Sequence, residues 1–284
     1  MSIIAIDLDG TLINSNHKVS EENIAAIKQA QKLGHEVVIA TGRAHFDVQK
    51  ILSGIGLSLY TIGANGATIH SPSGTNILSV TMPEQQTRSI IEWLDQEEFY
   101  YELFCESGIY TPKEGKEILQ AELNALEEKS SSSELDNMKL AYEKQIGQYG
   151  FVFMESYEKV FEDRQKVHNI LAFSFNDKKR KKGQDKFAES KNLTLVSSSK
   201  YNFELEHFNA SKGKALRYLA KVLNMNMDHS MAIGDSENDI SMFKVVSNSF
   251  AMENADRNVQ SHARYLAPSQ DDHGVAKAIG QFLD

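Results

Sequence analysis

The chain has 284 residues, which is enough for two domains of ordinary size or for one large domain. Hydrophobic residues make up 41% of it and charged residues 24%, which excludes wholesale disorder and a fibrous repeat. The formal net charge of -9 argues against a general nucleic-acid binder, because binding along a phosphate backbone requires a basic surface.

The first predicted element is a strand. Residues 2–6 form a short apolar run without alternation, which is typical of a strand buried on both faces of a parallel sheet. This strand ends at Asp7. A helix is predicted next, because Ser20 and the two glutamates after it form an N-cap signature and Gly34 marks the end.

A second buried strand is predicted at residues 36–40. It completes one strand-helix-strand unit and ends at Thr41-Gly42-Arg43. We expect a second helix from Ala44 to about Leu52. An apolar stretch at 57–62 and the turn-forming pair Asn65-Gly66 follow it.

The pattern changes between about residues 82 and 208 to mixed strands and amphipathic helices. We interpret this segment as an inserted second domain. Its two biased tracts, Ser130–Ser133 and Lys178–Lys182, look like solvated loops. The basic tract has no interleaved aromatic residues, so we do not interpret it as a nucleic-acid site.

The buried-strand pattern returns at residues 230–233, directly before Gly234-Asp235, and a closing helix is predicted from about Val275 to Leu283. We therefore predict an α/β fold. Residues 1–81 and 209–284 form a Rossmann-like, doubly wound parallel-sheet core, and residues 82–208 form an α+β cap domain inserted into it.

The single cysteine, Cys105, cannot form an intramolecular disulfide, and we interpret it as a small buried apolar residue. No secretory signal pattern opens the chain, and no run of about 18 uncharged apolar residues occurs in it. We therefore expect a cytoplasmic protein without a membrane partner.

Polar side chains follow three of the predicted buried strands. In an open parallel sheet, ligands bind outside the carboxyl ends of the strands, so these residues should converge in one crevice. The residues concerned are Asp7 and Asp9, then Thr41 and Gly42, and last Asp235, Asn238 and Asp239.

Four carboxylates in one crevice repel one another unless a hard divalent cation lies among them. Oxygen ligands beside a phosphate are typical of Mg²⁺. Asp7 and Asp9 can both face the crevice, because alternate residues of an extended segment point the same way. One can attack phosphorus to form an aspartyl-phosphate while the other moves protons, and Mg²⁺ offsets the charge.

The phosphate oxygens also need hydrogen-bond donors. Ser211 is predicted to be the N-cap of a helix whose amide end and Lys212 ammonium face the phosphate. The Thr41 hydroxyl and the Gly42 amide would add further donors. Each motif alone is compatible with a turn, a strand exit or a surface residue, but their joint occurrence favours a phosphate-transfer site.

With these motifs the chain resembles the haloacid dehalogenase superfamily of phosphohydrolases, in particular its Cof-type sugar-phosphatase branch. The resemblance is carried by Asp7-Leu8-Asp9-Gly10-Thr11-Leu12, Thr41-Gly42-Arg43, Ser211-Lys212-Gly213 and Gly234-Asp235-Ser236-Glu237-Asn238-Asp239, with similar surroundings in Asn65-Gly66-Ala67, Ala251-Met252-Glu253-Asn254-Ala255 and Asp272-His273-Gly274-Val275-Ala276. Glu253 stands where the family often has glycine, and no catalytic role depends on that position.

The resemblance implies a set of roles. Asp7, the backbone carbonyl of Asp9 and Asp235 would hold Mg²⁺. Asp239 would support the metal site or Lys212. The phosphate would be held by Leu8, Thr41, Gly42, Lys212 and Asn238. We assign Asp7 as the nucleophile and Asp9 as the general acid/base.

Other residues receive structural interpretations. Arg43 and His45 follow the second predicted strand and could approach the site, but we favour packing at a helix entry or a surface position for both. Aromatic residues of the inserted segment, Trp93, Tyr100, Tyr101 and Phe104, are interpreted as core.

The expected function is hydrolysis of a small phosphorylated metabolite, such as a sugar phosphate, with the cap selecting the substrate. A phosphotransferase or phosphomutase would use the same aspartyl-phosphate. A noncatalytic phospho-ligand sensor would keep the fold without the chemistry. Residues 82–208 carry no motif that identifies the substrate, and the sequence does not indicate an oligomeric state.

Overall fold

The computed structural model describes residues 2–127, 130–190 and 192–284. The chain divides into two compact units. Met1–Ser79 and Asn209–Asp284 form the first, which we name the core unit, and Val80–Phe208 form the second, which we name the cap unit. The core unit is therefore discontinuous in sequence.

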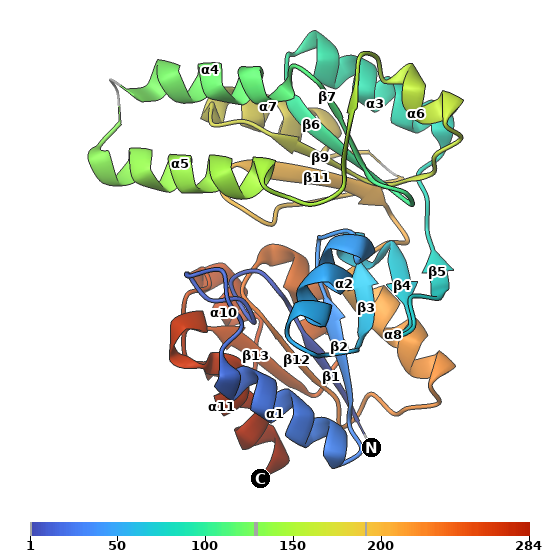
Figure 1. Ribbon diagram of the computed structural model, residues 1–284, viewed down its shortest axis with the longest axis vertical. Helices are drawn as coiled ribbons and strands as arrows, with labels where there is room; N and C mark the ends of the chain where they lie inside the picture. Colours follow the sequence, from blue (N-terminus) through green and yellow to red (C-terminus); the bar gives the residue numbers. More distant parts are fainter. Residues whose placement is uncertain (1, 128–129, 191) are drawn as a thin grey trace. The chain divides into compact units, whose positions relative to one another are not determined.

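The core unit is built on an eight-stranded sheet (Figure 1). Its strands are β1 (Ile3–Ile6), β2 (Glu36–Ala40), β3 (Tyr60–Gly63), β4 (Thr68–His70), β5 (Asn76–Ser79), β12 (Met231–Gly234), β13 (Asn248–Met252) and β14 (Tyr265–Ala267). They are ordered β14-β13-β12-β1-β2-β3-β4-β5, and neighbours are parallel from β14 through β3. The predicted doubly wound parallel sheet is confirmed, and the antiparallel pair β4 and β5 extends one edge.

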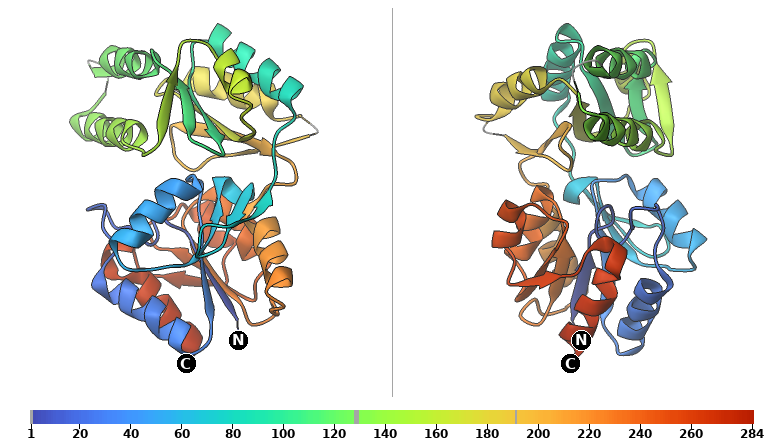
Figure 2. Two further views of the ribbon diagram at one scale, coloured as in Figure 1. Left: turned by 45° about the vertical axis from the view of Figure 1, so that its right-hand side comes forward. Right: turned by 90° about the vertical axis from the view of Figure 1, so that its left-hand side faces the viewer.

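Helices cover both faces of this sheet. One face packs against α1 (Glu21–Lys32), α2 (His45–Gly54) and α11 (Gly274–Leu283), and Figures 1 and 2 show α1 and α11 side by side. The other face packs against α8 (Lys212–Val222), α9 (Ile240–Phe243) and α10 (Arg257–Ser261). Within the described ranges, no helix is long and apolar enough to cross a membrane.

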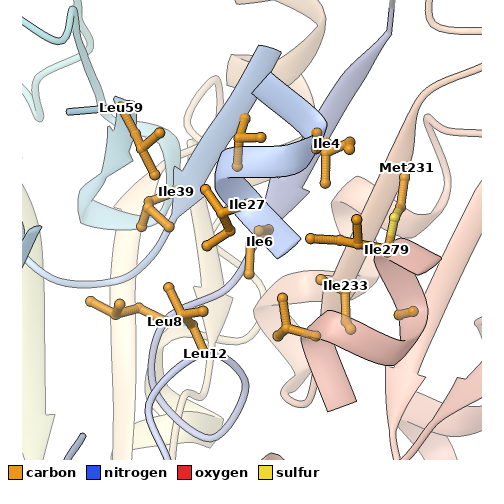
Figure 3. Packing of buried hydrophobic residues seen from close by; sticks show 14 of the residues in the cluster. Ile4, Ile6, Leu8, Leu12, Ile27, Ile39, Leu59, Met231, Ile233 and Ile279 are labelled. Carbon is orange, nitrogen blue, oxygen red and sulfur yellow. The ribbon is translucent and has the colours of Figure 1, made fainter. Parts of the chain in front are cut away.

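Alternate residues of the central strand β1 supply both hydrophobic layers. Ile4 and Ile6 lie in the cluster with α1 and α11, where Figure 3 shows them close to Ile27. Ile3 and Ala5 lie in the cluster with α8 on the opposite face. Because successive strand residues point to opposite faces, a continuous apolar run is needed to bury both sides.

The predicted caps and turn are confirmed. Ser20 accepts a hydrogen bond from the Asn23 amide at the start of α1, and Ser211 accepts one from the Lys214 amide at the start of α8. Asn65 lies in the 3-10 turn η1 (Ala64–Gly66), which joins the antiparallel strands β3 and β4. These local interactions fix where the chain leaves each strand.

The cap unit is built on a six-stranded sheet ordered β10-β11-β9-β6-β7-β8. Its pairs are antiparallel except for β7 and β8. Its strands are β6 (Tyr100–Cys105), β7 (Ile109–Pro112), β8 (Phe151–Met154), β9 (Val167–Phe173), β10 (Leu193–Val196) and β11 (Asn202–His207). Its helices are α3 (Glu84–Gln96), α4 (Gly115–Glu127), α5 (Ser132–Ile146), α6 (Glu158–Glu162) and α7 (Asp177–Phe187).

The interpretation of the basic tract as a solvated loop is wrong, and that of the serine tract holds only for Ser130 and Ser131, because Ser132 and Ser133 begin α5. The basic tract Lys178–Lys182 lies inside helix α7, where Lys182 pairs with Glu97 at 2.6 Å and Lys179 pairs with Glu122 at 2.8 Å. Lysine and arginine favour helices, and carboxylates distant in sequence offset their charge. In the serine tract, Ser131 caps α5.

The core of the cap unit also contains buried ionisable groups. Tyr100 and two glutamines, Gln145 and Gln148, donate hydrogen bonds to the fully buried Glu102. Burial raises the pKa of Glu102 to about 7 and lowers the pKa of the buried His168 to about 4.

The structural interpretation of the cap aromatics and of the cysteine is confirmed. Tyr100, Tyr101 and Phe104 of β6 are buried, and Trp93 packs against the hydrophobic cluster that contains Tyr101. Cys105 is buried too, and burial raises the pKa of its thiol. These residues therefore stabilise the cap unit.

Substitution of two helical glycines by alanine should have opposite effects on the stability of the protein. A Cβ on Gly183 would lie 2.5 Å from the Phe203 ring, whereas a Cβ on Gly280 would have no neighbour within 4 Å. Gly183→Ala should therefore destabilise the protein by about 1–3 kcal/mol through overpacking. Gly280→Ala should stabilise it by about 0.5–1 kcal/mol through helix propensity. Urea unfolding followed by circular dichroism measures both, and shifts in the same direction would contradict the prediction.

Glu102 and His168 should give the cap unit opposing pH dependences. With a pKa of about 7 against its ordinary 4.5, folded Glu102 binds the extra proton, so its contribution to stability grows as pH falls between these values. With a pKa of about 4 against 6.5, His168 binds the extra proton when unfolded, so stability falls as pH falls between them.

We therefore expect Glu102→Gln to make cap stability decrease as pH falls below about 6.5, and His168→Asn to make it increase below about 7. Trp93 is the single tryptophan, so its fluorescence during urea titrations reports cap unfolding. Equal pH profiles in the two variants would refute this assignment.

Candidate active site

The carboxyl ends of three neighbouring strands bring predicted site residues together. β1 lies between β2 and β12 and is parallel to both. Asp7, Thr41 and Asp235 directly follow these strands and therefore emerge at the same edge of the sheet. We name this edge of the core unit the catalytic edge.

A buried ammonium group lies at the catalytic edge. Lys212 Nζ is 2.7 Å from Asp7 Oδ1 and 2.5 Å from Asp239 Oδ1, and the lysine side chain has no exposed surface. Burial disfavours the charged form of Lys212, but attraction to Asp239 and Asp7 outweighs burial and raises its pKa. The lysine is therefore a fixed positive charge at neutral pH.

Three carboxylates form a compact cluster around this charge. Asp7, Asp235 and Asp239, named here the carboxylate cluster, offer oxygen atoms within 4.8 Å of one another. Burial, and then repulsion by Asp239, raises the pKa of Asp7 and raises the pKa of Asp235 to about 6. An all-oxygen donor set with excess negative charge fits a hard divalent cation such as Mg²⁺.

The loop after β1 closes over Asp235. The Thr11 hydroxyl donates a hydrogen bond to Asp235 Oδ1 at 3.1 Å. Gly10 has φ +82°, and a Cβ there would lie 2.4 Å from Asp235 Oδ2, so this position requires glycine. Asn254 donates a hydrogen bond to the Gly10 carbonyl at 2.9 Å, which links a late motif of the chain to this loop.

Asp239 connects the buried lysine to the loop after β12. In addition to the Lys212 ammonium, it accepts hydrogen bonds from the backbone amides of Asp235 and Ser236, each at 3.0 Å. These bonds fix both the position and the rotation of the Asp239 carboxylate. Asp239 is thus held in a position that supports both Lys212 and the cluster.

The residues expected to hold phosphate lie around the same edge. The Leu8 side chain is fully buried in the hydrophobic core, so only its backbone can face a ligand. Thr41 is buried, and its hydroxyl accepts a hydrogen bond from the Arg43 amide at 3.1 Å. Gly42 follows it, and a Cβ there would lie 3.1 Å from Asn65 Oδ1.

Asn238 is oriented by a residue to which we gave no role. Its Nδ2 donates to Asn65 Oδ1 at 2.9 Å, which fixes the plane of the amide. Its Oδ1 is buried and has no hydrogen-bond partner in the described part of the chain. Asn65 belongs to the motif Asn65-Gly66-Ala67, one of the surroundings that carry the resemblance, and that motif was the sequence signal for its role.

The favoured interpretation of Arg43 as a packing or surface residue is wrong, and the alternative that it approaches the predicted site residues holds. Its Nε and Nη2 lie 2.6 and 2.8 Å from the two carboxylate oxygens of Asp9, and its Nη1 lies 2.5 Å from Asp47 Oδ2. These contacts outweigh burial and raise the pKa of Arg43. Its place directly after the second buried strand was the available signal.

His45 has the packing role that the sequence suggested. It begins α2, and its ring stacks on His70 with the ring centroids 3.7 Å apart. Burial lowers the pKa of His45, so the stacked ring is neutral at physiological pH.

The cap unit contains a separate cleft of about 540 Å³. Phe99 and Tyr101 contribute to its apolar lining, and Glu98 and Glu122 are among the carboxylates around it. Among the described residues that line it, the one lysine is Lys179, which is already paired with Glu122. An acidic lining repels phosphate, and none of the residues described as lining it is a predicted site residue, so this cleft does not match the predicted phosphate site.

Comparison with known proteins identifies similar chains over the whole length. A family model described as haloacid dehalogenase-like hydrolase matches residues 4–279. Phosphatase YwpJ of Bacillus subtilis is 43% identical, with 100% of both chains covered. The B. subtilis 5-amino-6-(5-phospho-D-ribitylamino)uracil phosphatase YwtE is 35% identical over 100% of this chain and 98% of the relative. A solved structure of a haloacid dehalogenase-like hydrolase from B. subtilis matches with a TM-score of 0.88 at 43% identity and covers 99% of both chains.

Removal of the buried ammonium should destabilise the core unit. Lys212→Met leaves Asp7 and Asp239 buried without a compensating charge, which should cost about 3–5 kcal/mol of unfolding free energy. Lys221→Met, on an exposed position of the same helix, should change stability by less than about 1 kcal/mol. Urea unfolding compares the two variants, and equal losses would show that the ion pair is not a major source of stability.

Proposed function

The chain belongs to the haloacid dehalogenase-like hydrolases, and we propose that it is a Mg²⁺-dependent phosphatase that acts on small phosphorylated metabolites through an aspartyl-phosphate on Asp7. The observation that carries the proposal is the ion pair of Asp7 with the buried Lys212, within the carboxylate cluster. A carboxylate fixed in this way can attack a phosphorus atom that the same lysine attracts.

Two aspartates would divide the chemistry. Asp7 forms a bond to phosphorus while the ester bond to the leaving oxygen breaks, and Asp9 gives that oxygen a proton. In the second step Asp9 takes a proton from water, the water oxygen bonds to phosphorus, and the bond to Asp7 breaks. The separate partners of the two carboxylates, Lys212 and Arg43, support this division.

Asp7, Asp235 and the backbone carbonyl of Asp9 would hold Mg²⁺, which when bound offsets the negative charge of the cluster and the phosphate. Donors for the phosphate oxygens would come from the catalytic edge and from the amide end of α8. These donors are the backbone of Leu8 and Gly42, the Thr41 hydroxyl, the Lys212 ammonium and the Asn238 amide.

We assign substrate selection to the cap unit, in keeping with the common use of inserted segments to close over a substrate. The relatives include a phosphatase named for 5-amino-6-(5-phospho-D-ribitylamino)uracil, which is a small phosphorylated metabolite. The proposed substrate class for this chain is accordingly a small phosphomonoester of the cytoplasm.

Replacement of either aspartate should stop phosphate release. Asp7→Asn should abolish the Mg²⁺-dependent release of phosphate from para-nitrophenyl phosphate, because the amide is a poor nucleophile. Asp9→Asn should lower kcat by about 10²–10⁴-fold through loss of proton transfer. Asp228→Asn, an exposed aspartate of the same unit, serves as the control and should keep full activity. Removal of Mg²⁺ by a chelator should abolish turnover reversibly.

The same assay separates the alternatives. Undiminished turnover by Asp7→Asn would refute the proposed nucleophile. Phosphate transfer only when an alcohol acceptor is present would indicate a phosphotransferase or mutase. Binding of phosphorylated compounds without turnover across a broad metabolite panel would indicate a sensor.

A further inference from the structure

We propose that Arg43 and Asp47 are positioning residues that hold the Asp9 carboxylate for proton transfer and keep it from becoming a metal ligand. The inference deepens the proposed function and rests on it. It assigns a task to an arginine that neither binds the carboxylate cluster nor belongs to the phosphate donors.

The contact between Arg43 and Asp9 is bidentate. Nε and Nη2 of the guanidinium face the two oxygens of one carboxylate, at 2.6 and 2.8 Å. A planar fork of this kind fixes the rotation of the carboxylate as well as its distance. The Asp9 side chain is 25% exposed, so without the fork it would sample several rotamers.

Arg43 is itself held at three points. Its Nη1 lies 2.5 Å from Oδ2 of Asp47, a buried residue in the first turn of α2. Its backbone amide donates to the Thr41 hydroxyl, and its carbonyl accepts from the Ala64 amide at 2.9 Å. The guanidinium is therefore presented to Asp9 by a supported side chain, and Asp47 belongs to that support.

The fork also separates Asp9 from the carboxylate cluster. Within the described part of the chain, the acidic side chains that converge closely enough to hold a metal are Asp7, Asp235 and Asp239. Asp9 lies two residues from Asp7 but is directed to Arg43. A divalent cation attracts any nearby carboxylate, and a side chain bound to the metal could not carry a proton to the leaving oxygen. Arg43 competes for that carboxylate.

Charge and geometry can be separated by two substitutions. Arg43→Lys keeps a positive charge and loses the fork, whereas Arg43→Ala loses both. Arg257→Ala, an exposed arginine of the same unit, is the matched control. For each variant we would measure kcat and KM with para-nitrophenyl phosphate, rescue by added guanidinium, and Mg²⁺ affinity by calorimetry. Asp47→Asn, which leaves Arg43 in place, keeps the test available if an Arg43 variant fails to fold.

We expect kcat about 10- to 100-fold lower in both Arg43 variants with KM little changed, because a misplaced catalytic group loses mainly transition-state stabilisation. Added guanidinium should restore part of kcat in Arg43→Ala. Mg²⁺ should bind Arg43→Ala on the order of fivefold more tightly, since one positive charge is removed and Asp9 is released. Arg43→Lys keeps the charge but loses the fork, so its Mg²⁺ affinity should lie between those of the parent protein and Arg43→Ala. Asp47→Asn should lower kcat in the same direction but less.

The proposal would be overturned by unchanged kcat in Arg43→Lys and Asp47→Asn. It would also be overturned if the loss of kcat in Arg43→Ala came with weaker Mg²⁺ binding and without rescue by guanidinium, since that pattern marks a purely structural role. If the parent protein released no phosphate, the proposed function would fail, while the Mg²⁺ titrations would still test whether Arg43 keeps Asp9 from the metal.

Discussion

The arrangement of the catalytic edge depends on the buried ammonium of Lys212. Asp7 and Lys212 are 205 residues apart in sequence, so their contact at 2.7 Å joins the two segments of the discontinuous core unit. Buried ion pairs are stable only when further hydrogen bonds offset the loss of water. Here the hydrogen bonds that two backbone amides donate to Asp239 offset this loss. The Lys212 ammonium in turn allows the Asp7 and Asp239 carboxylates to lie close together. Without this charge, a compact cluster of carboxylates would not be tolerated in the core.

The order of the strands explains how residues from distant motifs meet around the Lys212 ammonium. β1 is central, with β2 from the same N-terminal segment on one side and β12 from the C-terminal segment on the other. Parallel strands end at the same edge, so residues from three distant motifs meet without long loops. The cap unit is inserted into the sequence after β5, and in the strand order β5 and β12 lie on opposite sides of β1. The pairing of β1 with β12 therefore does not involve the strand that precedes the insertion. A large insertion is therefore compatible with an intact catalytic edge.

Sequence patterns predicted the place of a site residue where local structure determines that place. They failed where the role of a residue depends on the direction of its side chain. The polar residues at the ends of buried strands, Asp7 and Asp235, could be placed because continuous apolar runs mark such strands. Arg43 could not be assigned, because arginines are usually exposed and nothing in the sequence tells which way one points. The same is true of Glu102, whose hydrogen-bond donors Gln145 and Gln148 are more than forty residues away in sequence.

In the proposed mechanism, the aspartates of the catalytic edge have different tasks. The aspartates that meet there are chemically identical, and their partners distinguish them. Asp7 is paired with Lys212, Asp235 accepts from the Thr11 hydroxyl, and Asp9 is held by Arg43. When several groups are chemically equal, their different surroundings decide which one acts as nucleophile and which one as acid or base. Asp7 shares the Lys212 ammonium with the carboxylate cluster, so it is suited to attack a phosphate that this ammonium attracts. Asp9 is paired with Arg43 outside the cluster, so it remains available for proton transfer.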